Sequence, residues 1–412
     1  MTQTFVLRLA GFANKGAEAM LLSARNAILR NVSDARIFVQ LKPEYALCAS
    51  TEGMLPLLPR SESRKDKLRL LADMRFRHDD VRRGVLRTRH EQALQMRAAG
   101  PCHVIDLAGF AYGDDWPESQ ADTAVGWKNH AQACGCRAAF APQAWGPFAK
   151  PAWRTVLPKM LDGALFYARD ARSQSMLSEA IHADVPLQRD IAFSFADGDK
   201  ALGARLLSGL PWKDDAKPLV VVTPNVRLYE RSEGSGSGNA MVRALVETVR
   251  RLRSELNCRV LLLGNEMMLA HRTKPDDRFL CALVEAVCDQ PGEIVAMRKW
   301  LSAAEVRSIL MNAEMAVSAR YHSILLAATA GCPVLALSWS HKYEYLLEDV
   351  GLDGWIVRGE DAEWDKLAPK ALELWEARRE TREILDGTVP ALRREATDFL
   401  DDLVRRMVSE SR

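Results

Sequence analysis

The chain has 412 residues, 48% of them hydrophobic, which is more than one core usually organises and predicts two domains. Its 56 Lys and Arg are nearly balanced by 54 Asp and Glu, and the formal charge of +2 excludes nucleic-acid binding driven by bulk charge. The eight cysteines include no C-x-x-C pair and no dense disulfide framework, so we expect a protein of the reducing cytoplasm.

The amino-terminal segment TFVLRLAG has the pattern of a buried strand, and Arg8 interrupts it too early for a signal peptide. A helix is expected to begin in the following NKGAEAM stretch, which places Asn14, Lys15 and Glu18 at a strand-to-helix turn. The turn matches neither a P-loop nor a G-x-G-x-x-G motif. Its polar residues could therefore orient a substrate or simply cap the helix.

Strand-like runs then alternate with amphipathic helical patterns through both halves of the chain, as in parallel sheets covered by helices. The first half contains ARIFVQL, HVIDLAG, RAAFAPQ and GALFYAR, and the second contains KPLVVVTPN, RVLLLGN, EIVAM, EMAVSA and PVLALS. Helices are expected near residues 240–256, 277–288, 302–312 and 321–330. The predicted fold class is α/β, with two doubly wound, Rossmann-like domains facing across a cleft.

A segment with Gly, Pro and Asp between residues 195 and 215 predicts the boundary between domains 1–200 and 201–412, the second ending in helices. Within the first domain, the stretch Arg60–Arg97 is basic and amphipathic. This pattern is typical of a solvated helical face, and contact with anionic headgroups is the alternative hypothesis. No run of about eighteen apolar residues occurs, so no membrane-spanning helix is expected.

Polar residues follow several predicted strands of the second domain. Arg320 and His322 come directly after EMAVSA, where the first turn of the next helix favours an anion. Arg320 offers a fixed cation for a carboxylate or phosphate, and His322 can exchange a proton near neutral pH. Arg227, Glu266 and Lys342 follow other strands. Each could be structural alone, but parallel strands end at a common edge, where we expect a ligand site.

The sequence offers little for metal binding or for nucleophilic catalysis. Cys134-Gly135-Cys136 with His130 is too compact for a tetrahedral zinc site and predicts simple packing instead. No nucleophile elbow and no Ser-His-Asp order occurs. We therefore expect no metal site.

Taken together, these segments give a sequence that resembles the polysaccharide pyruvyl transferase family. The matching segments occur in the family's order: GFANKGAEAMLL, DLAGFAYGD, APQAWGPF, YARDARS, the arginine of TPNVR, and SARYHSILLAATAGCPVLAL followed by HKYE. They extend from residue 5 to about residue 350. One departure is the Lys-Gly-Ala-Glu of the first segment, where many members have Gly-Asp, and it leaves the choice of acceptor open.

The resemblance implies a GT-B-like fold and transfer of pyruvate from phosphoenolpyruvate to sugar hydroxyls as a ketal, with release of phosphate. It implies His322 as the acid/base residue and a donor site in the second domain formed by Arg227, Arg320, Lys342 and Glu266. The first domain would be the acceptor side, with contacts from Asn14, Lys15, Glu18 and Gln143. No cofactor is expected beyond the donor substrate.

The partners implied are phosphoenolpyruvate and a saccharide, either a polysaccharide or its lipid-linked precursor, and no nucleic acid. A cytoplasmic enzyme that works on lipid-linked units would explain the basic stretch through peripheral contact with the inner membrane surface. One alternative is a GT-B glycosyltransferase whose Glu344 or Glu348 binds the ribose of a nucleotide sugar. A second is a catalytically inactive subunit of a polysaccharide-synthesis complex.

Overall fold

The computed structural model describes residues 2–58, 92–117, 119–269, 275–340, 342–359 and 362–409, which form two compact units. Unit 1 comprises Met1–Gly11, Leu21–Ile191 and Asp398–Arg412, and unit 2 comprises Phe12–Met20 and Ala192–Thr397. The predicted division at residue 200 assigned the whole first helix to the N-terminal domain. The structure instead groups its first turns with unit 2, because Lys15 N–H donates to the Asn265 carbonyl and Met267 N–H to the Ala13 carbonyl.

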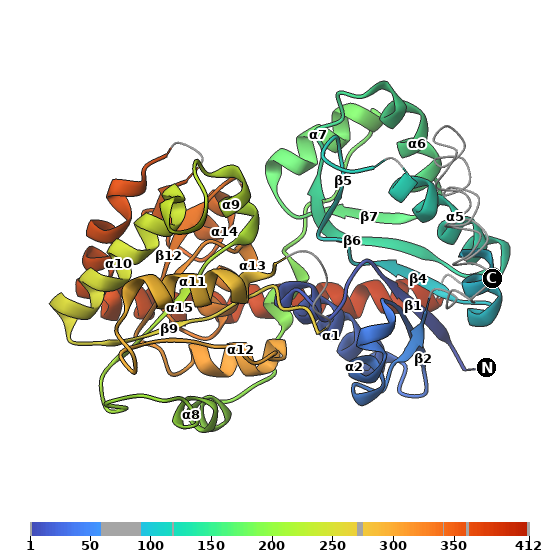
Figure 1. The fold of residues 1–412 in the computed structure, drawn as a ribbon. Coiled ribbons are helices and arrows are strands. Elements are labelled where there is room, and N and C mark those ends of the chain that lie inside the picture. The colour runs from blue at the N-terminus through green and yellow to red at the C-terminus, as the bar shows by residue number, and fades with distance from the viewer. Residues whose placement is uncertain are drawn as a thin grey trace, which may run out of the picture. The chain divides into compact units, whose positions relative to one another are not determined.

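Unit 1 contains a seven-stranded parallel sheet of order β3-β2-β1-β4-β6-β5, with β7 paired to β6. Its strands are β1 (Thr4–Arg8), β2 (Arg36–Gln40), β3 (Leu55–Leu57), β4 (His103–Asp106), β5 (Phe110–Tyr112), β6 (Ala138–Trp145) and β7 (Leu165–Ala168). The helices along this part of the chain are α1 (Lys15–Asn31), α2 (Ala46–Thr51), α5 (Ser119–Ala133), α6 (Pro151–Leu161) and α7 (Ala171–Ile181). Figure 1 shows helices on both faces of the sheet.

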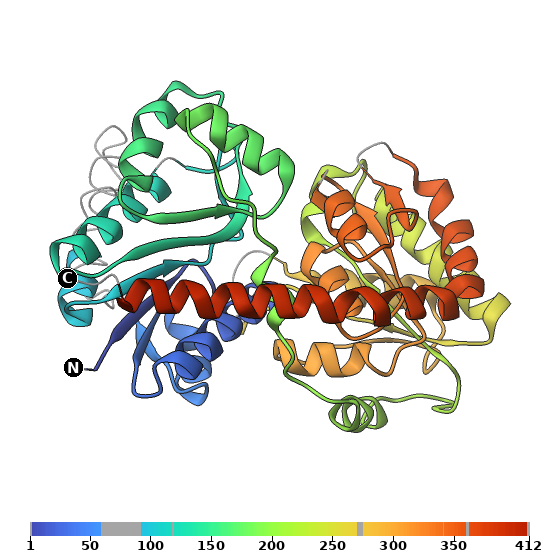
Figure 2. The same cartoon turned by 180° about the vertical axis from the view of Figure 1, so that it is seen from behind.

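Unit 2 contains a six-stranded parallel sheet of order β10-β9-β8-β11-β12-β13. Its strands are β8 (Leu219–Thr223), β9 (Arg259–Leu262), β10 (Ile294–Ala296), β11 (Met315–Ser318), β12 (Val334–Ser338) and β13 (Ile356–Arg358). Its helices are α8 (Lys200–Ser208), α9 (Val226–Arg231), α10 (Ala240–Leu256), α11 (Asp277–Cys288), α12 (Ala303–Leu310), α13 (Tyr321–Thr329) and α14 (Lys342–Asp349). The long α15 (Leu367–Ser409), red in Figure 2, belongs to unit 2 as far as Thr397 and to unit 1 from Asp398.

The structure confirms the predicted α/β class. Every strand predicted from the sequence is present, and the four helices predicted in the second half begin and end within two residues of α10, α11, α12 and α13. The strands that the sequence did not reveal are β3, β5 and β13. Each has three residues, and so short a run shows no measurable alternation; β10 is equally short but was predicted because it lies in the apolar run of EIVAM.

Local sequence explains where the helices of unit 2 begin and end. The side chain of Asn239 accepts the N–H of Val242 at the start of α10, and Asn257 ends that helix in the left-handed conformation, at φ 49°. Ser302 and Glu305 form a capping box on α12. The apolar stripes of α10, α11 and the first turns of α15 then pack with the strands in one continuous core.

In both sheets the strand order reverses at one point, between β1 and β4 in unit 1 and between β8 and β11 in unit 2. Ligands of doubly wound folds bind beyond the carboxyl ends of the strands at such a point. We call the ends of β8, β9, β11 and β12 the carboxyl edge of unit 2. This edge carries the polar residues predicted for the donor site and for catalysis: Arg227, Glu266, Arg320, His322 and Lys342.

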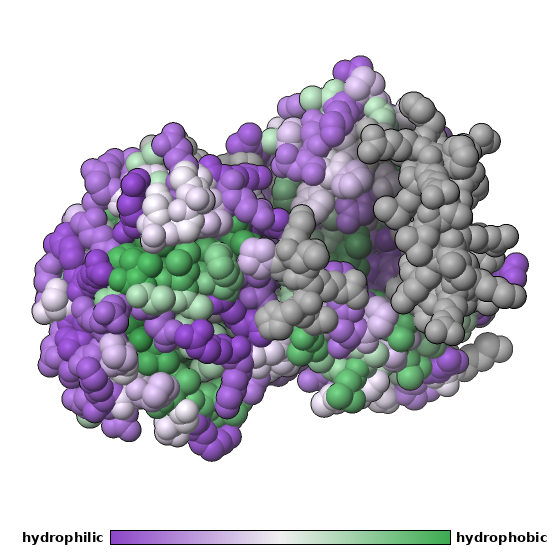
Figure 3. All heavy atoms as spheres, in the orientation of Figure 1, coloured by the Kyte–Doolittle hydropathy of each residue, from purple (hydrophilic) through white to green (hydrophobic). Residues whose placement is uncertain are grey.

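The helix α11 is apolar on its outer surface as well as in the core. Figure 3 shows hydrophobic side chains over it, and Phe279 is 45% exposed. Among the described residues, no helix has a stretch apolar enough to cross a bilayer. The basic stretch Arg60–Arg97 lies outside the described residues except for its last six, so the structure adds nothing to the membrane hypothesis.

Candidate active site

Arg320 lies at the switch point of unit 2, directly after β11. It is the N-cap of α13, with extended backbone angles (φ −118°, ψ 123°), and α13 is buried from Ser323 to Thr329. The predicted strand-to-helix position of Arg320 and His322 is thus confirmed. The residue before Arg320 is bonded to the loop after β8, because Asn225 Nδ2 donates to the Ala319 carbonyl at 2.8 Å.

The Arg320 guanidinium is nearly buried and contacts two carboxylates. Nε donates to Asp277 Oδ2 at 3.0 Å, Nη2 donates to Asp277 Oδ1 at 2.5 Å, and Nη2 lies 2.9 Å from Glu266 Oε2. Burial alone would lower the pKa of Arg320, but the charges of Asp277 and Glu266 raise it above its ordinary value. Nη1 has no hydrogen-bond partner in the described part of the chain, so it remains able to bind an anion.

Asp277 organises the carboxyl edge and was missed by the sequence analysis. Its carboxylate is fully buried and accepts the N–H of Val226 at 3.0 Å, of Asn265 at 3.2 Å and of Glu266 at 2.8 Å, besides the two bonds from Arg320. One side chain therefore joins the loops that follow β8, β9 and β11. In the sequence, Asp276-Asp277 before an apolar helix indicates only a cap, which Asp276 in fact provides.

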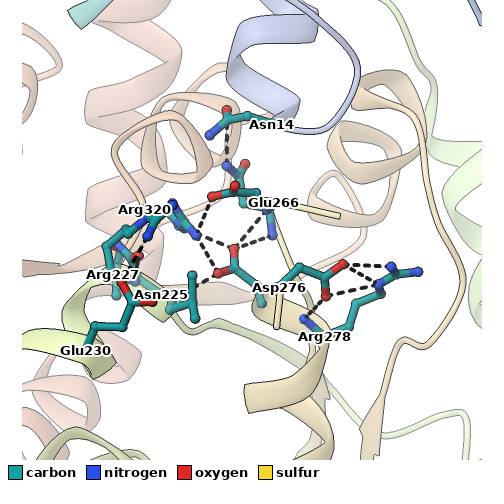
Figure 4. A network of polar contacts seen from close by, with 12 residues as sticks. Asn14, Asn225, Arg227, Glu230, Glu266, Asp276, Arg278 and Arg320 are labelled. Atoms are coloured by element: carbon teal, nitrogen blue, oxygen red, sulfur yellow. Dashed lines mark hydrogen bonds and ion pairs between the residues drawn. The ribbon is translucent and has the colours of Figure 1, made fainter. Parts of the chain in front are cut away.

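Figure 4 shows how the first turn of α1 meets this network at Asn14. Asn14 Oδ1 accepts the N–H groups of Gly16 and Ala17, and Asn14 forms an antiparallel bridge with Glu266. The side chain of Asn14 is therefore the helix cap that the sequence allowed. The same turn brings Asn14 beside the donor-site candidates, within one unit.

Lys15 and Glu18 form a buried pair on the inner side of this turn. Lys15 Nζ donates to the Phe12 carbonyl at 2.6 Å and to Glu18 Oε2 at 2.9 Å, and it lies 4.0 Å from the ring centroid of Trp300. Glu18 Oε1 accepts the N–H of Ala303, the first residue of α12. Both side chains are at most 2% exposed, so in this structure they fix α1 to α12.

His322 packs directly against the backbone of α1. A Cβ atom placed on Gly16 would lie 1.8 Å from His322 Cγ, so only glycine allows the ring its position. The ring also contacts Tyr321 edge-on, with centroids 5.0 Å apart. Gly16, which the sequence indicates only as part of a turn, therefore determines the position of the predicted acid/base residue His322.

Further cations lie at the ends of β8 and β12. Arg227 is 47% exposed and is paired with the equally exposed Glu230 at 2.9 Å. The Nζ of Lys342, at the start of α14, lies 4.5 Å from the ring centroid of Trp339, and the Arg231 guanidinium lies 4.5 Å from the same centroid. Exposed pairs such as Arg227–Glu230 exchange partners at little cost, so Arg227 can turn toward an anion.

Gln143 belongs to unit 1, on β6, and is fully buried. Its side-chain amide has no hydrogen-bond partner within the residues that the structure describes. The corresponding switch point of unit 1 holds a different buried cluster, in which Asp106 Oδ2 accepts from Arg8 and from the Tyr112 hydroxyl. Burial raises the pKa of Asp106, although Arg8 and the hydrogen bonds oppose this. The DLAGFAYGD segment is therefore a structural core of that switch point.

The residues placed by the structure include no set of three His, Cys, Asp or Glu side chains grouped as metal ligands. The Cys134 N–H donates to the His130 carbonyl at 3.2 Å, a backbone bond at the end of α5, and His130 Nε2 bonds the Gly100 carbonyl at 2.8 Å. The buried His103 is structural as well: Nδ1 accepts the Arg137 N–H, and Nε2 lies 3.2 Å from Gln3 Oε1. Burial lowers the pKa of His103 to about 4.

The family described as polysaccharide pyruvyl transferase matches the chain over residues 14–341, well over half its length. No curated protein matches it. Among solved structures, the UDP-GlcNAc 2-epimerase from Neisseria meningitidis is similar, with TM-score 0.57, 10% identity and coverage of 98% of this chain and 100% of that one. Alr3699/HepE of Anabaena, solved with UDP, gives TM-score 0.59, 11% identity and coverage of 99% and 100%.

The spinosyn rhamnosyltransferase SpnG, for which no organism is named, gives TM-score 0.51 and 11% identity, with coverage of 98% of this chain and 99% of that one. At such identities the likeness concerns the fold alone. These epimerases and glycosyltransferases share the two-domain GT-B architecture, which confirms the predicted fold class.

Proposed function

We propose phosphoenolpyruvate as the pyruvyl donor of this protein, which belongs to the polysaccharide pyruvyl transferase family and is therefore a transferase of polysaccharide pyruvylation. The observation that carries the proposal is the buried Arg320 at the amino end of α13, with His322 two residues further on. A donor with a carboxylate and a phosphate requires fixed cations, and this position combines one with the N–H groups of a helix start.

Donor binding would use the cations of the carboxyl edge. Arg320 offers Nη1, and the first turn of α13 adds oriented N–H groups. Arg227 would close on the other end of the donor, because its present pair with Glu230 is exposed and weak, and Lys342 at the start of α14 would add a second cation there. In this arrangement the cations also stabilise the phosphate as it leaves.

His322 would act as the acid and then as the base. Its imidazolium gives a proton to the methylene carbon of the donor, the adjacent carbon becomes electrophilic, and a sugar hydroxyl attacks that carbon. Departure of phosphate and attack by a second hydroxyl close the ketal. One hydroxyl proton restores the His322 imidazolium, and the other leaves with the phosphate. Such a proton-transfer group contributes about 10²- to 10⁴-fold to the rate. No step transfers electrons, so we propose no redox cofactor.

For the acceptor, Asn14 borders the donor-site candidates, whereas Lys15 and Glu18 would act by holding the turn of Asn14 in place. Within unit 1, Gln143 stays a proposed acceptor residue, because its side-chain amide has no partner in the described residues. We propose as acceptor a polysaccharide or its lipid-linked precursor, and a cytoplasmic enzyme with peripheral contact to the membrane surface. Co-sedimentation with anionic vesicles at low salt tests this, and its absence would contradict the membrane contact.

The test of the donor is a thermal-shift comparison of phosphoenolpyruvate with UDP, GDP and their sugars. A ligand at a hundredfold its dissociation constant stabilises the protein by about 2.7 kcal/mol and raises the midpoint by a few degrees. We expect a shift with phosphoenolpyruvate alone. A shift with a nucleotide alone would favour the glycosyltransferase alternative. Its ribose contact at Glu344 would first have to release Arg358, whose Nε lies 2.9 Å from Glu344 Oε1.

A further inference from the structure

The two carboxylates that contact Arg320 are held very differently. Asp277 is fully buried and accepts five hydrogen bonds, three of them from backbone N–H groups. The Glu266 side chain is 22% exposed, and in the described part of the chain its carboxylate contacts only Arg320 Nη2, at 2.9 Å. One carboxylate is therefore a fixed part of the fold, and the other is held by a single contact.

The cluster of Arg320, Asp277 and Glu266 carries too much negative charge to bind an anionic ligand in its present arrangement. One guanidinium between two carboxylates leaves a net charge of −1 around Arg320. A phosphate or carboxylate that approached Nη2 would meet the Glu266 carboxylate at hydrogen-bond distance, and like charges so close repel strongly when partly buried. Binding of an anion at Nη2, beside the open Nη1, therefore requires that Glu266 leave.

We infer that Glu266 is an exchangeable counter-ion of Arg320 that sets the affinity of the site for its anionic ligand. When the ligand binds, an oxygen of its phosphate or carboxylate replaces Glu266 Oε2 at Nη2, and the Glu266 side chain turns to solvent. Asp277 keeps Arg320 in place throughout. The identity of the ligand as phosphoenolpyruvate rests on the proposed function, whereas the exchange itself does not.

The backbone around Glu266 shows that this exchange needs only side-chain rotation. Glu266 N–H is bonded to Asp277 Oδ2 at 2.8 Å, its carbonyl accepts the Asp277 N–H at 3.2 Å, and the residue forms the bridge with Asn14. These contacts hold the loop after β9 whether or not the carboxylate stays on Arg320. The change therefore involves no loss of secondary structure.

The experiment is calorimetric titration with phosphoenolpyruvate of the wild-type chain, Glu266→Gln, Asp277→Asn and the control Glu255→Gln. Glu255 makes an exposed pair with Arg251 on α10, so its substitution makes the same chemical change away from the carboxyl edge. A charged hydrogen bond changes an equilibrium constant by about tenfold or more. We expect Glu266→Gln to bind about tenfold more tightly, Asp277→Asn at least tenfold more weakly, and Glu255→Gln like the wild type.

The outcomes separate this inference from the donor assignment. Equal or weaker binding by Glu266→Gln, with wild-type binding intact, would overturn the exchange and leave the donor assignment standing. Parallel titrations use inorganic phosphate and UDP. If one of them binds and Glu266→Gln tightens it while phosphoenolpyruvate binds no variant, the exchange holds and the donor is wrong. If no anion binds any variant, both proposals fail. Thermal midpoints of all four proteins exclude misfolding as the cause.

Discussion

Gly16 allows the sharpest test of the place assigned to His322. In Gly16→Ala the new Cβ would lie 1.8 Å from His322 Cγ, whereas carbon atoms in contact lie about 3.5 to 4.0 Å apart. The ring must therefore move by more than about 1 Å. A misplacement of this size at a catalytic group lowers turnover by about 10²-fold. We expect that loss, because His322 would no longer reach the methylene carbon of the donor.

The assay measures release of phosphate from phosphoenolpyruvate with a competent acceptor, together with the free energy of unfolding. The expected signature is a large fall in kcat with a fold that stays intact, because alanine also favours the helix by up to about 1 kcal/mol and offsets part of the clash.

The matched control is Gly387→Ala in α15, where a Cβ would meet no atom within 4 Å. This variant should keep full activity and unfold at the same or slightly higher denaturant concentration. Near-normal turnover by Gly16→Ala would refute the placement of His322 as the acid/base residue, since the ring could not stay where the structure has it.

Three further predictions concern single side chains. His322→Ala should abolish turnover and leave phosphoenolpyruvate binding within about threefold by calorimetry, and retained turnover would contradict the proton-transfer role. Lys15→Met should lower the free energy of unfolding by about 3 to 5 kcal/mol, because Glu18 loses its buried cation. The double variant Lys15→Met/Glu18→Gln should recover part of that loss. A loss under about 1 kcal/mol in Lys15→Met would contradict the buried pair. Burial lowers the pKa of His103 in the folded chain to about 4. As the pH falls from 6.5 to 4, the unfolded chain therefore takes up a proton that the folded chain does not, and the free energy of unfolding falls by about 3 kcal/mol. His103→Gln should remove that part of the pH dependence in denaturant unfolding, and an unchanged slope would contradict it.

The fold was largely predictable because its signals are local. Within KPLVVVTPN, the segment Leu219–Thr223 is fully buried as β8 and begins with four consecutive apolar residues, and α10 carries its own caps at Asn239 and Asn257. The strands that escaped prediction were too short to show a pattern. The interleaving of the two units was not predictable, because it depends on backbone bonds between α1 and the loop after β9 that no periodicity reveals.

The position of the candidate site could be predicted from the sequence, but the side chains that hold Arg320 and His322 in place could not. Strand ends of a parallel sheet meet at one edge, so Arg320, His322 and Glu266 could be grouped from topology alone. Asp277 and Arg320 are 43 residues apart in the sequence, and their hydrogen bonds are visible only in the structure. In the sequence, an aspartate beside a helix cap does not indicate such a partner. The dependence of His322 on Gly16 is equally a matter of three-dimensional contact.

The measurement that tests the central claim most directly follows two labels in one reaction. The protein is incubated with carbon-labelled phosphoenolpyruvate, tritium-labelled UDP-sugars and a panel of saccharides, lipid-linked and free, with His322→Ala as the blank. Pyruvyl transfer predicts that the carbon label enters a saccharide with one phosphate released for each pyruvate, and that the variant transfers none. Transfer of the tritium label instead would contradict it and assign the carboxyl edge of unit 2 to a nucleotide sugar.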